Sequence, residues 1–367
     1  MPFGGDNKCT LAPATAISES VKQAALQIGF DLAGIAGIGE FPELEYFPKW
    51  VEAGYAGEMK YLETRDETGH LKRATLSRVA PWARSVVVCA LNYNTAHAYS
   101  TQVTDPQRGW ISRYAWSRDD YHEAVMRRLR EVERRIHEFS DHPLESRCYV
   151  DTGPLVERVY AKYAGVGWIG KNTCVLNQKL GSWLFLGVIL TSLELQPDTP
   201  APDRCGTCTR CIDACPTGAF VGPYRLDSNK CISYLTIEKR GTIVDDLRDG
   251  MGRQVFGCDI CQDVCPWNRK APVTQAEEFQ PRPELVNPAL EWLAQMDAEE
   301  FARAFRRSPV KRAKLSGMRR NAAIAMGNSG NQKFLPILEQ LAEGPDRVVA
   351  DAARWATGKL RGCVDER

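Results

Sequence analysis

The chain has 367 residues, which is long enough for roughly two or three domains, each with its own hydrophobic core. Its hydrophobic share of 44%, charged share of 25% and net charge of +1 are those of an ordinary globular protein. No run of about 18 apolar residues occurs, which excludes a membrane span, and the longest apolar run, Trp183 to Leu190, has the length of a strand. The N-terminus lacks the basic and apolar regions of a secretory signal, so we expect a cytoplasmic protein.

Residues 1–195 are predicted to form an α/β domain, because segments with helical and strand patterns alternate along them. The predicted elements are a helix at 17–28 with Ser18 near its N-terminal cap, strands at 32–38 and 85–91, a helix at 119–139, a short strand that ends at Val150, and a strand at 183–191. This alternation favours a layered α/β arrangement. No Gly-x-Gly-x-x-Gly motif follows a strand and no P-loop is present, so neither nicotinamide nor ATP binding is predicted.

Two segments of this domain carry residues suited to chemistry. Asp151 stands where the short strand is expected to end and is followed by a Gly-Pro turn, a place where functional groups are common. It could instead cap the helix expected at 155–163. The glycine-rich segment 165–173 can bring the backbone close to a large ligand, or it is a loop whose glycines adopt positive φ. The residues alone leave both pairs of interpretations open.

Thirteen cysteines in a chain without a predicted signal peptide argue against a disulfide framework, since cytosolic thiols stay reduced. Eight of them lie between positions 205 and 265. The other five are scattered and are expected to be ordinary buried or surface thiols: Cys9, Cys89, Cys148, Cys174 and Cys363.

The eight clustered cysteines have the spacing of a bacterial ferredoxin, in which the last cysteine of each run binds the other cluster. The first run ends in Cys215-Pro216, and the second, which follows a lone Cys231, ends in Cys265-Pro266. The predicted ligands of the first [4Fe–4S] cluster are Cys205, Cys208, Cys211 and Cys265, and those of the second cluster are Cys215, Cys231, Cys258 and Cys261. Zinc sites usually use two separated pairs of cysteines, which fits this spacing poorly. Two adjacent clusters form a one-electron relay.

Residues 281–367 are predicted to be helical after a polar linker that runs to about residue 288. Residues 322–327 and 353–358 form a weak repeat, offset by 31 residues, in which a glycine is expected to end each helix; this suggests stacked helix pairs of the HEAT type. Between 301 and 338 the chain has nine Lys or Arg and no Asp or Glu. Such a stretch is either the solvated face of a helical cap or a surface for a polyanionic partner.

Several short motifs occur together in one order along the chain. They are Ile111–Ala115, Asp119–His122, Asp151–Arg158, Gly170–Thr173, Gly181–Trp183 and Cys215–Ala219, beside the cysteine runs. As a set they resemble the epoxyqueuosine reductase family, which is related to the cobalamin-dependent reductive dehalogenases. The similarity extends from about residue 15 to the C-terminus, and its C-terminal part is less distinctive.

The resemblance implies a reaction, its cofactors and its partners. Members of the family reduce epoxyqueuosine to queuosine at the wobble position of the tRNA anticodon, the last step of queuosine biosynthesis. They hold cobalamin on the α/β domain and pass electrons to its cobalt from [4Fe–4S] clusters. The implied partners are tRNA carrying epoxyqueuosine and an external electron donor such as a flavodoxin or ferredoxin, and we expect a monomer.

The resemblance also implies roles for individual residues, with Asp151 matching the proton donor of the family. The residues expected to bind cobalamin are Tyr114, Asp151, Lys171, Asn172 and Ser182, and Arg158 is expected to bind tRNA. With the basic stretch facing phosphates, further tRNA contacts are expected from Arg312, Arg319 and Arg320. The expected division is a cobalamin-binding α/β domain at 1–195, a ferredoxin-like module at 196–280 and a HEAT-like tRNA-docking domain at 281–367.

The chemistry suits these groups. Removing an epoxide oxygen requires electrons, which low-potential clusters supply one at a time, and a proton, which a carboxylic acid shielded from water can hold at neutral pH. The common cobalamin motif Asp-x-His-x-x-Gly is absent, so a bound cobalamin is expected to lack a histidine ligand below cobalt.

Two other functions are compatible with parts of the sequence. A ferredoxin-type electron carrier would need the cysteine runs but would not use Asp151, the glycine-rich segment or the basic stretch. A small-molecule reductive dehalogenase usually has a twin-arginine leader, which is missing here, and has no use for a basic helical arm. The tRNA-modifying enzyme is therefore the preferred hypothesis.

Overall fold

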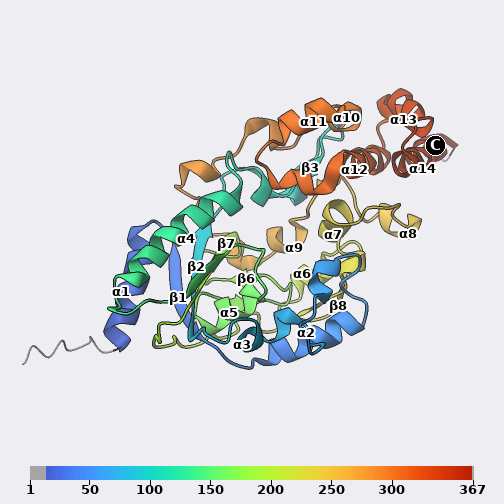
Figure 1. Cartoon of the computed structure of the whole chain (residues 1–367). Coiled ribbons are helices and arrows are strands. Elements are labelled where there is room, and N and C mark those ends of the chain that lie inside the picture. The colour runs from blue at the N-terminus through green and yellow to red at the C-terminus, as the bar shows by residue number, and fades with distance from the viewer. Residues whose placement is uncertain (1–13, 366–367) are drawn as a thin grey trace, which may run out of the picture.

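A four-stranded antiparallel sheet forms the centre of the N-terminal half (Figure 1). The structure, a computed structural model, describes residues 14–365 and their side chains up to residue 362, so Cys9 and the side chain of Cys363 lie outside it. In spatial order the strands are β1 (Leu32–Gly37), β2 (Ser85–Asn92), β7 (Leu184–Thr191) and β4 (Ser146–Tyr149). β2 is buried along its whole length, as its β-branched sequence predicts. All four strands expected from the sequence are confirmed.

Helices cover both faces of this sheet because successive strand residues point to opposite sides. The helices of this half are α1 (Ala14–Gln27), α2 (Pro42–Glu52), α3 (Leu76–Val79), α4 (Tyr121–His137) and α5 (Glu157–Tyr163). α1 and α4 pack on the face that carries Val87 and Ile189, and α5 packs on the face that carries Val88 and Val188. Gly187 lets α4 approach β7 closely, since an added Cβ there would lie 2.7 Å from a side-chain carbon of α4.

The two long helices expected from the sequence are confirmed as α1 and α4. Asp120 caps α4 by accepting a hydrogen bond from the backbone N–H of His122 at 3.0 Å. Ser18, however, does not cap α1, and that prediction is wrong. The chain is already helical at Ala14, so the Ser18 hydroxyl lies one turn inside, where it donates to the Ala14 carbonyl at 2.7 Å and accepts from the backbone N–H of Gln196 at 2.8 Å.

The segment 196–280 consists of short elements joined by loops. They are α6 (Arg210–Asp213), β8 (Phe220–Gly222), β9 (Arg225–Leu226), α7 (Ile232–Ile237), α8 (Asp245–Arg248), β10 (Gln254–Phe256) and α9 (Ile260–Asp263). β10 pairs in parallel with β3 (Trp110–Ile111) of the N-terminal half. The glycine-rich segment forms a separate hairpin of β5 (Trp168–Ile169) and β6 (Val175–Leu176). Strand pairing therefore joins this segment to the N-terminal half.

The C-terminal segment is helical, as predicted, and Figure 1 shows its helices grouped at the end of the molecule away from α1. They are α10 (Leu290–Gln295), α11 (Ala298–Ala304), α12 (Lys314–Asn328), α13 (Leu335–Ala342) and α14 (Arg347–Asp365). The repeat segments lie on α12 and α14, which pack closely: an added Cβ on Gly327 would lie 2.8 Å from Ala356 Cβ. Gly327 is next to the end of α12, but Gly358 lies inside α14, so the prediction that it ends a helix is wrong. α14 continues because Leu360 is buried in the core.

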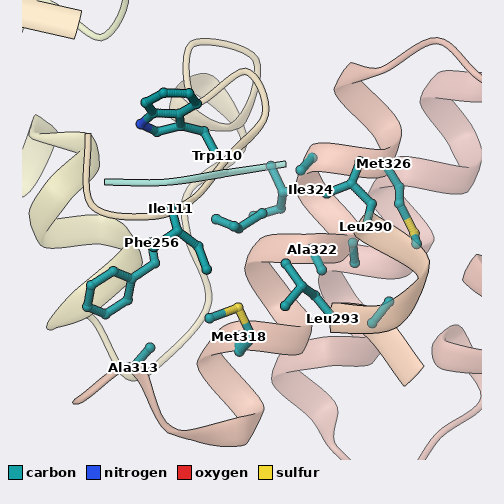
Figure 2. Close-up of a cluster of buried hydrophobic side chains, with 14 of the residues drawn as sticks. Trp110, Ile111, Phe256, Leu290, Leu293, Ala313, Met318, Ala322, Ile324 and Met326 are labelled. Atoms are coloured by element: carbon teal, nitrogen blue, oxygen red, sulfur yellow. The ribbon is translucent and has the colours of Figure 1, made fainter. Parts of the chain in front are cut away.

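One hydrophobic core is shared by distant parts of the chain (Figure 2). It includes Trp110 and Ile111 of β3, Phe256 of β10, Leu290 of α10 and Met318 of α12. The expected division of the chain into three segments therefore does not correspond to three separate cores. Within the described range, no helix is long and apolar enough to cross a membrane.

Candidate active site and cluster cavity

Asp151 lies in the loop between β4 and α5. Its backbone adopts a left-handed conformation with φ of 56°, which aspartate tolerates better than most residues. Oδ2 accepts a hydrogen bond from the Tyr121 hydroxyl at 3.0 Å, and the side chain is 70% exposed. The N-terminal cap of α5 is Val156, without any side-chain hydrogen bond, so the interpretation of Asp151 as a helix cap is wrong. The surroundings shielded from water that its expected role requires are not formed by the protein alone.

The first turn of α4 presents a second group of polar side chains to Asp151. The His122 ring stacks on Tyr121 with centroids 4.0 Å apart. Its Nδ1 lies 2.7 Å from Asp120 Oδ1, and its Nε2 lies 3.9 Å from Asp151 Oδ2. A carboxylate that caps the helix thus also orients the imidazole toward the site. Sequence reasoning included Asp120, Tyr121 and His122 in a motif but assigned them no role; the capping aspartate directly before the helix was the available signal.

Two phenols next to Asp151 are held in their protonated form. Burial raises the pKa of Tyr114 and of Tyr121 well above the usual value, and the negative charge of Asp151 adds to this. Tyr114 packs edge-on against Tyr121, with ring centroids 6.0 Å apart, and tilts against Phe256 at the same distance. At neutral pH the Tyr121 hydroxyl is therefore a hydrogen-bond donor to the Asp151 carboxylate.

A second carboxyl group, Glu157, lies near Asp151 at the start of α5. Its Oε1 is buried and has no hydrogen-bond partner among the described residues. Burial raises the pKa of this carboxyl to about 7, and the charge of Asp151 acts in the same direction. Glu157 is therefore partly protonated at neutral pH, whereas an ordinary glutamate is ionised. Sequence reasoning missed this residue because its surface-like polar pattern gives no sign of burial.

Arg158, the next residue, is exposed and donates to the Thr173 carbonyl oxygen at 2.9 Å. It connects α5 to the tip of the β5–β6 hairpin.

Three residues expected to bind cobalamin, a call that stays a prediction, contact the cysteine-containing segment. Lys171 Nζ donates to the carbonyl oxygens of Gly206 and Cys208 at 2.7 and 3.0 Å. Asn172 donates to the Cys261 carbonyl at 3.3 Å. Ser182 is buried, and its hydroxyl accepts from the side-chain amides of Gln262 and Asn268. Both lone pairs of the Ser182 oxygen are thus used within the protein, its O–H remains a donor, and its cobalamin contact stays a prediction.

Four cysteines line one cavity of about 350 Å³ between the hairpin and the cysteine-containing loops. They are the four expected for the first cluster: Cys205, Cys208, Cys211 and Cys265. Lys171, Asn172 and Trp267 also line it. In the described part of the chain no three His, Cys, Asp or Glu side chains converge tightly enough to hold a single metal ion. Thiols spread around a cavity fit a cluster of several iron atoms.

The other four clustered cysteines form a second group, and each of them is half-buried. Burial raises the pKa of the Cys258 thiol well above its usual value, and Cys231 and Cys215 raise it further through their negative charge. For Cys261 the neighbouring Cys174 thiol has the largest effect in raising the pKa, followed by burial and by the charge of Cys258 and Cys231. Crowded buried thiolates are unfavourable unless positive charge offsets them, and the iron of a cluster supplies it. This donor set therefore fits a second cluster.

Cys174 is a ninth cysteine at the clusters. It lies in the hairpin close to the Cys261 thiol, which lowers the pKa of Cys174 to about 7. Sequence reasoning placed it among the scattered thiols, because its distance along the chain from the clustered cysteines gave no signal.

Seven of the nine basic residues between 301 and 338 are exposed: Arg303, Arg306, Arg307, Lys311, Arg312, Lys314 and Lys333. Arg307 forms an ion pair with Glu123 of α4 at 3.2 Å. Arg312 forms an ion pair with Glu238. Burial lowers the pKa of the Arg312 guanidinium, but the ion pair and the negative charge of Asp151 raise it by more, so the pKa is raised overall. The basic stretch therefore reaches the surroundings of Asp151.

Arg320 is buried, only 1% exposed, although its position in the basic stretch suggested a surface residue. Its guanidinium donates to the carbonyl oxygens of Leu235, Lys239 and Gly241 and to Asn321 Oδ1. Burial lowers the pKa of this group to about 10, so it stays charged at neutral pH. The expected tRNA contact of Arg320 is therefore wrong: the residue joins α12 to the end of α7. Arg319 is half-buried and donates to the Gln295 carbonyl at 3.4 Å.

Replacing Arg320 by Met is expected to lower the free energy of unfolding by about 3 kcal/mol, because several buried carbonyl oxygens lose their donor. Arg312→Gln removes an exposed ion pair and is expected to change that free energy by less than about 1 kcal/mol while weakening tRNA binding. Chemical denaturation measures the first effect, and tRNA affinity at low and high salt measures the second. Reduced tRNA affinity without reduced stability in Arg320→Met would contradict the assignment.

Two family models match this chain. The one described as a 4Fe-4S double cluster binding domain matches residues 204–268, and the one described as epoxyqueuosine reductase QueG, DUF1730, matches residues 73–152. The epoxyqueuosine reductase of Pseudomonas aeruginosa is 40% identical over 357 residues, covering 96% of this chain and 96% of the relative. That of Synechocystis sp. is 43% identical over 294 residues, covering 79% of this chain and 98% of the relative.

Solved structures of the same enzyme are also similar. A crystal structure of epoxyqueuosine reductase with an epoxyqueuosine-modified tRNA-Tyr stem loop has a TM-score of 0.83 and 31% identity, covering 94% of this chain and 90% of that one. A structure of the Bacillus subtilis enzyme has a TM-score of 0.83 and 30% identity, and it also covers 94% of this chain and 90% of that one. In that structure the catalytic loop, which carries an aspartate, is swung out of the active site.

Proposed function

The chain belongs to the epoxyqueuosine reductase family, and from this we propose how its residues reduce epoxyqueuosine to queuosine in tRNA. It is an oxidoreductase with a double [4Fe–4S] cluster domain over residues 204–268. Removing the epoxide oxygen as water consumes a pair of electrons and a pair of protons and leaves an alkene. The residues described above provide a place for the clusters, a route toward the substrate and a proton donor.

The cluster ligands are the two sets expected from the sequence. For the first cluster the support is the common cavity of Cys205, Cys208, Cys211 and Cys265. For the second it is the mutual proximity of Cys215, Cys231, Cys258 and Cys261. Lys171 and Asn172 hold the loops of both sets against the hairpin, which fixes the relay relative to the sheet.

Cobalamin, the cofactor implied by the family, would bind between the second cluster and Asp151, next to Tyr114, on the α/β half of the chain. When bound, it supplies a strongly reducing cobalt centre. The support is the close approach of the cluster loop: at Gly257, which precedes Cys258, an added Cβ would lie 2.5 Å from Ser112 Cβ and 3.6 Å from the Tyr114 ring. The distance for electron transfer from the second cluster to the proposed cobalamin position is therefore short. Asp151 lies on the other side of that position, close enough for its charge to raise the pKa of Tyr114.

Asp151 is the proposed proton donor, and its placement is the observation that carries the mechanism. The Tyr121 hydroxyl holds its carboxylate, and His122, oriented by Asp120, stands within 3.9 Å to return a proton after turnover. Substrate and cofactor would cover the exposed carboxyl group and give it the surroundings in which a carboxylic acid keeps its proton. In the Bacillus subtilis relative the catalytic loop with its aspartate is found swung out of the active site, and we propose that the exposed Asp151 loop can move in the same way.

The tRNA is proposed to lie over Asp151 and the exposed part of the basic stretch. Arg312 and Lys311 lie near the site, since the charge of Asp151 acts on Arg312 and that of Lys311 acts on Asp120. Arg158 and Arg319 remain predicted tRNA contacts, and the repeat-bearing helices α12 and α14 are proposed to form a HEAT-like support for this surface. A cytoplasmic location and a monomeric state also stay predictions.

The proposal is tested on protein purified without oxygen from cells supplied with cobalamin. We expect about eight iron atoms and one cobalt atom per chain, and conversion of epoxyqueuosine to queuosine in isolated tRNA with dithionite as reductant. Eight iron atoms without cobalt, even after soaking with cobalamin, would refute the cobalamin mechanism. A fully loaded protein that leaves epoxyqueuosine unchanged would refute the function.

A further inference from the structure

The first cluster cavity lies directly beneath an exposed loop. Residues 202–210 are exposed apart from Cys205 and Cys208, which are half-buried and line the cavity. The second cysteine group lies toward the proposed active site: at Gly257, which precedes Cys258, an added Cβ would lie 3.6 Å from the Tyr114 ring. Electrons from outside the protein therefore reach the first cluster most easily.

The surface around this cavity is basic. Arg204 and Arg210 are exposed and line the cavity, and Arg269 and Lys270 are exposed just after Trp267, which also lines it. We call these four residues the basic rim. Because Lys171 adds its charge from inside the cavity, the rim and its floor have a cluster of positive groups.

The same loop also has two acidic residues, Asp203 and Asp213, against five basic groups in the rim and Lys171 together. Asp203 accepts hydrogen bonds from the Cys205 backbone N–H at 2.7 Å and from the Tyr224 hydroxyl. Asp213 accepts from the Thr209 hydroxyl at 2.7 Å. From Val264 to Gln275 the chain has no acidic residue at all.

We infer that the basic rim is the docking surface for an acidic one-electron carrier protein, an inference that rests on the proposed function. In each encounter one electron passes from the carrier, which is oxidised, to the cluster beneath the rim, which is reduced, and no bond is formed or broken. Two encounters supply the electron pair of one turnover. Opposite charge raises the rate of such encounters by about tenfold to a thousandfold and makes it depend on salt.

A nucleic acid is the other partner that a basic surface fits, but the placement of the rim argues against it. The second cysteine group, not the first, adjoins Tyr114 and through it Asp151. A tRNA bound at the rim would therefore lie on the side of the relay away from the proton donor, while Arg312 already provides positive charge beside it.

The experiment follows the reduction of the clusters directly, without tRNA or cobalamin, so its outcome does not depend on whether the enzyme converts epoxyqueuosine. Reduced flavodoxin, an acidic protein, is mixed with oxidised enzyme in a stopped-flow instrument, and the bleaching of cluster absorbance gives the second-order rate. For Arg269→Gln/Lys270→Gln we expect this rate to fall about tenfold at low salt and its salt dependence to flatten. Bleaching by dithionite and the iron content are expected to stay unchanged.

Arg127→Gln/Arg130→Gln is the matched control, because it removes the same charge from exposed residues of α4. Its rate with flavodoxin is expected to equal that of the unaltered protein. Three outcomes would overturn the inference. The control could lose as much of the flavodoxin rate as the rim variant, or the rim variant could keep its rate and its salt dependence. The rim variant could also lose tRNA affinity while its flavodoxin rate stays unchanged. The charge-reversed Arg204→Glu/Arg210→Glu, normalised to its own dithionite rate, provides a second test with a larger expected loss.

Discussion

Asp151→Asn is expected to lower the rate of epoxyqueuosine reduction by about a hundredfold to ten-thousandfold, the range typical of a lost general acid. The amide keeps the size of the side chain and an oxygen for the Tyr121 hydroxyl, so the loop should keep its conformation. It cannot, however, give a proton to the departing oxygen. Single-turnover conversion of modified tRNA, measured at saturating enzyme, isolates this chemical step from binding.

Two other variants serve as comparisons for this result. Asp141→Asn changes an exposed aspartate in the loop after α4 and is expected to leave the rate unchanged. Glu157→Gln tests the second carboxyl group of the site, whose pKa near 7 would also allow it to hold a proton. A normal rate in Asp151→Asn together with a large loss in Glu157→Gln would transfer the role of donor to Glu157. Loss of iron or of tRNA affinity in Asp151→Asn would show a structural role instead.

Cys215→Ala is expected to abolish turnover and to reduce the iron content from about eight to about four atoms per chain, because one cubane loses a ligand. The crossed assignment makes a sharper claim about which cluster is lost. Although Cys215 belongs to the first run, its loss should remove the second cluster and leave the one in the surface cavity. Cys265→Ala, in the second run, should do the reverse.

Paramagnetic resonance spectra and the rate of reduction by flavodoxin distinguish the two variants. Cys215→Ala should still be reduced quickly, because its surface cluster remains beneath the basic rim, whereas Cys265→Ala should be reduced slowly. Cys148→Ala is the control, since this thiol lies on β4, outside both groups, and its iron content should stay at about eight. Loss of the same cluster in both variants would contradict the crossed assignment.

Sequence reasoning succeeded where the chemistry depends on residues that are close in the chain. Two intervening residues place successive cysteines on one short loop and turn, so their spacing alone indicates a cluster ligand set. The buried strands and the amphipathic α4 were likewise predictable, since each needs only its own period of apolar residues.

The tertiary structure decided what depends on burial and on distant partners. Arg320 and Arg312 look alike in the basic stretch, but Arg320 meets the Leu235 carbonyl from 85 positions away and is buried, while Arg312 stays exposed. Cys174 similarly joins the clusters only because the hairpin folds against Cys261. The sequence by itself therefore indicated the two clusters and the family, because local spacing and short motifs encode them. Which basic residues are exposed and which carboxyl group is buried were decided only by packing between segments far apart in the chain, which no local pattern records.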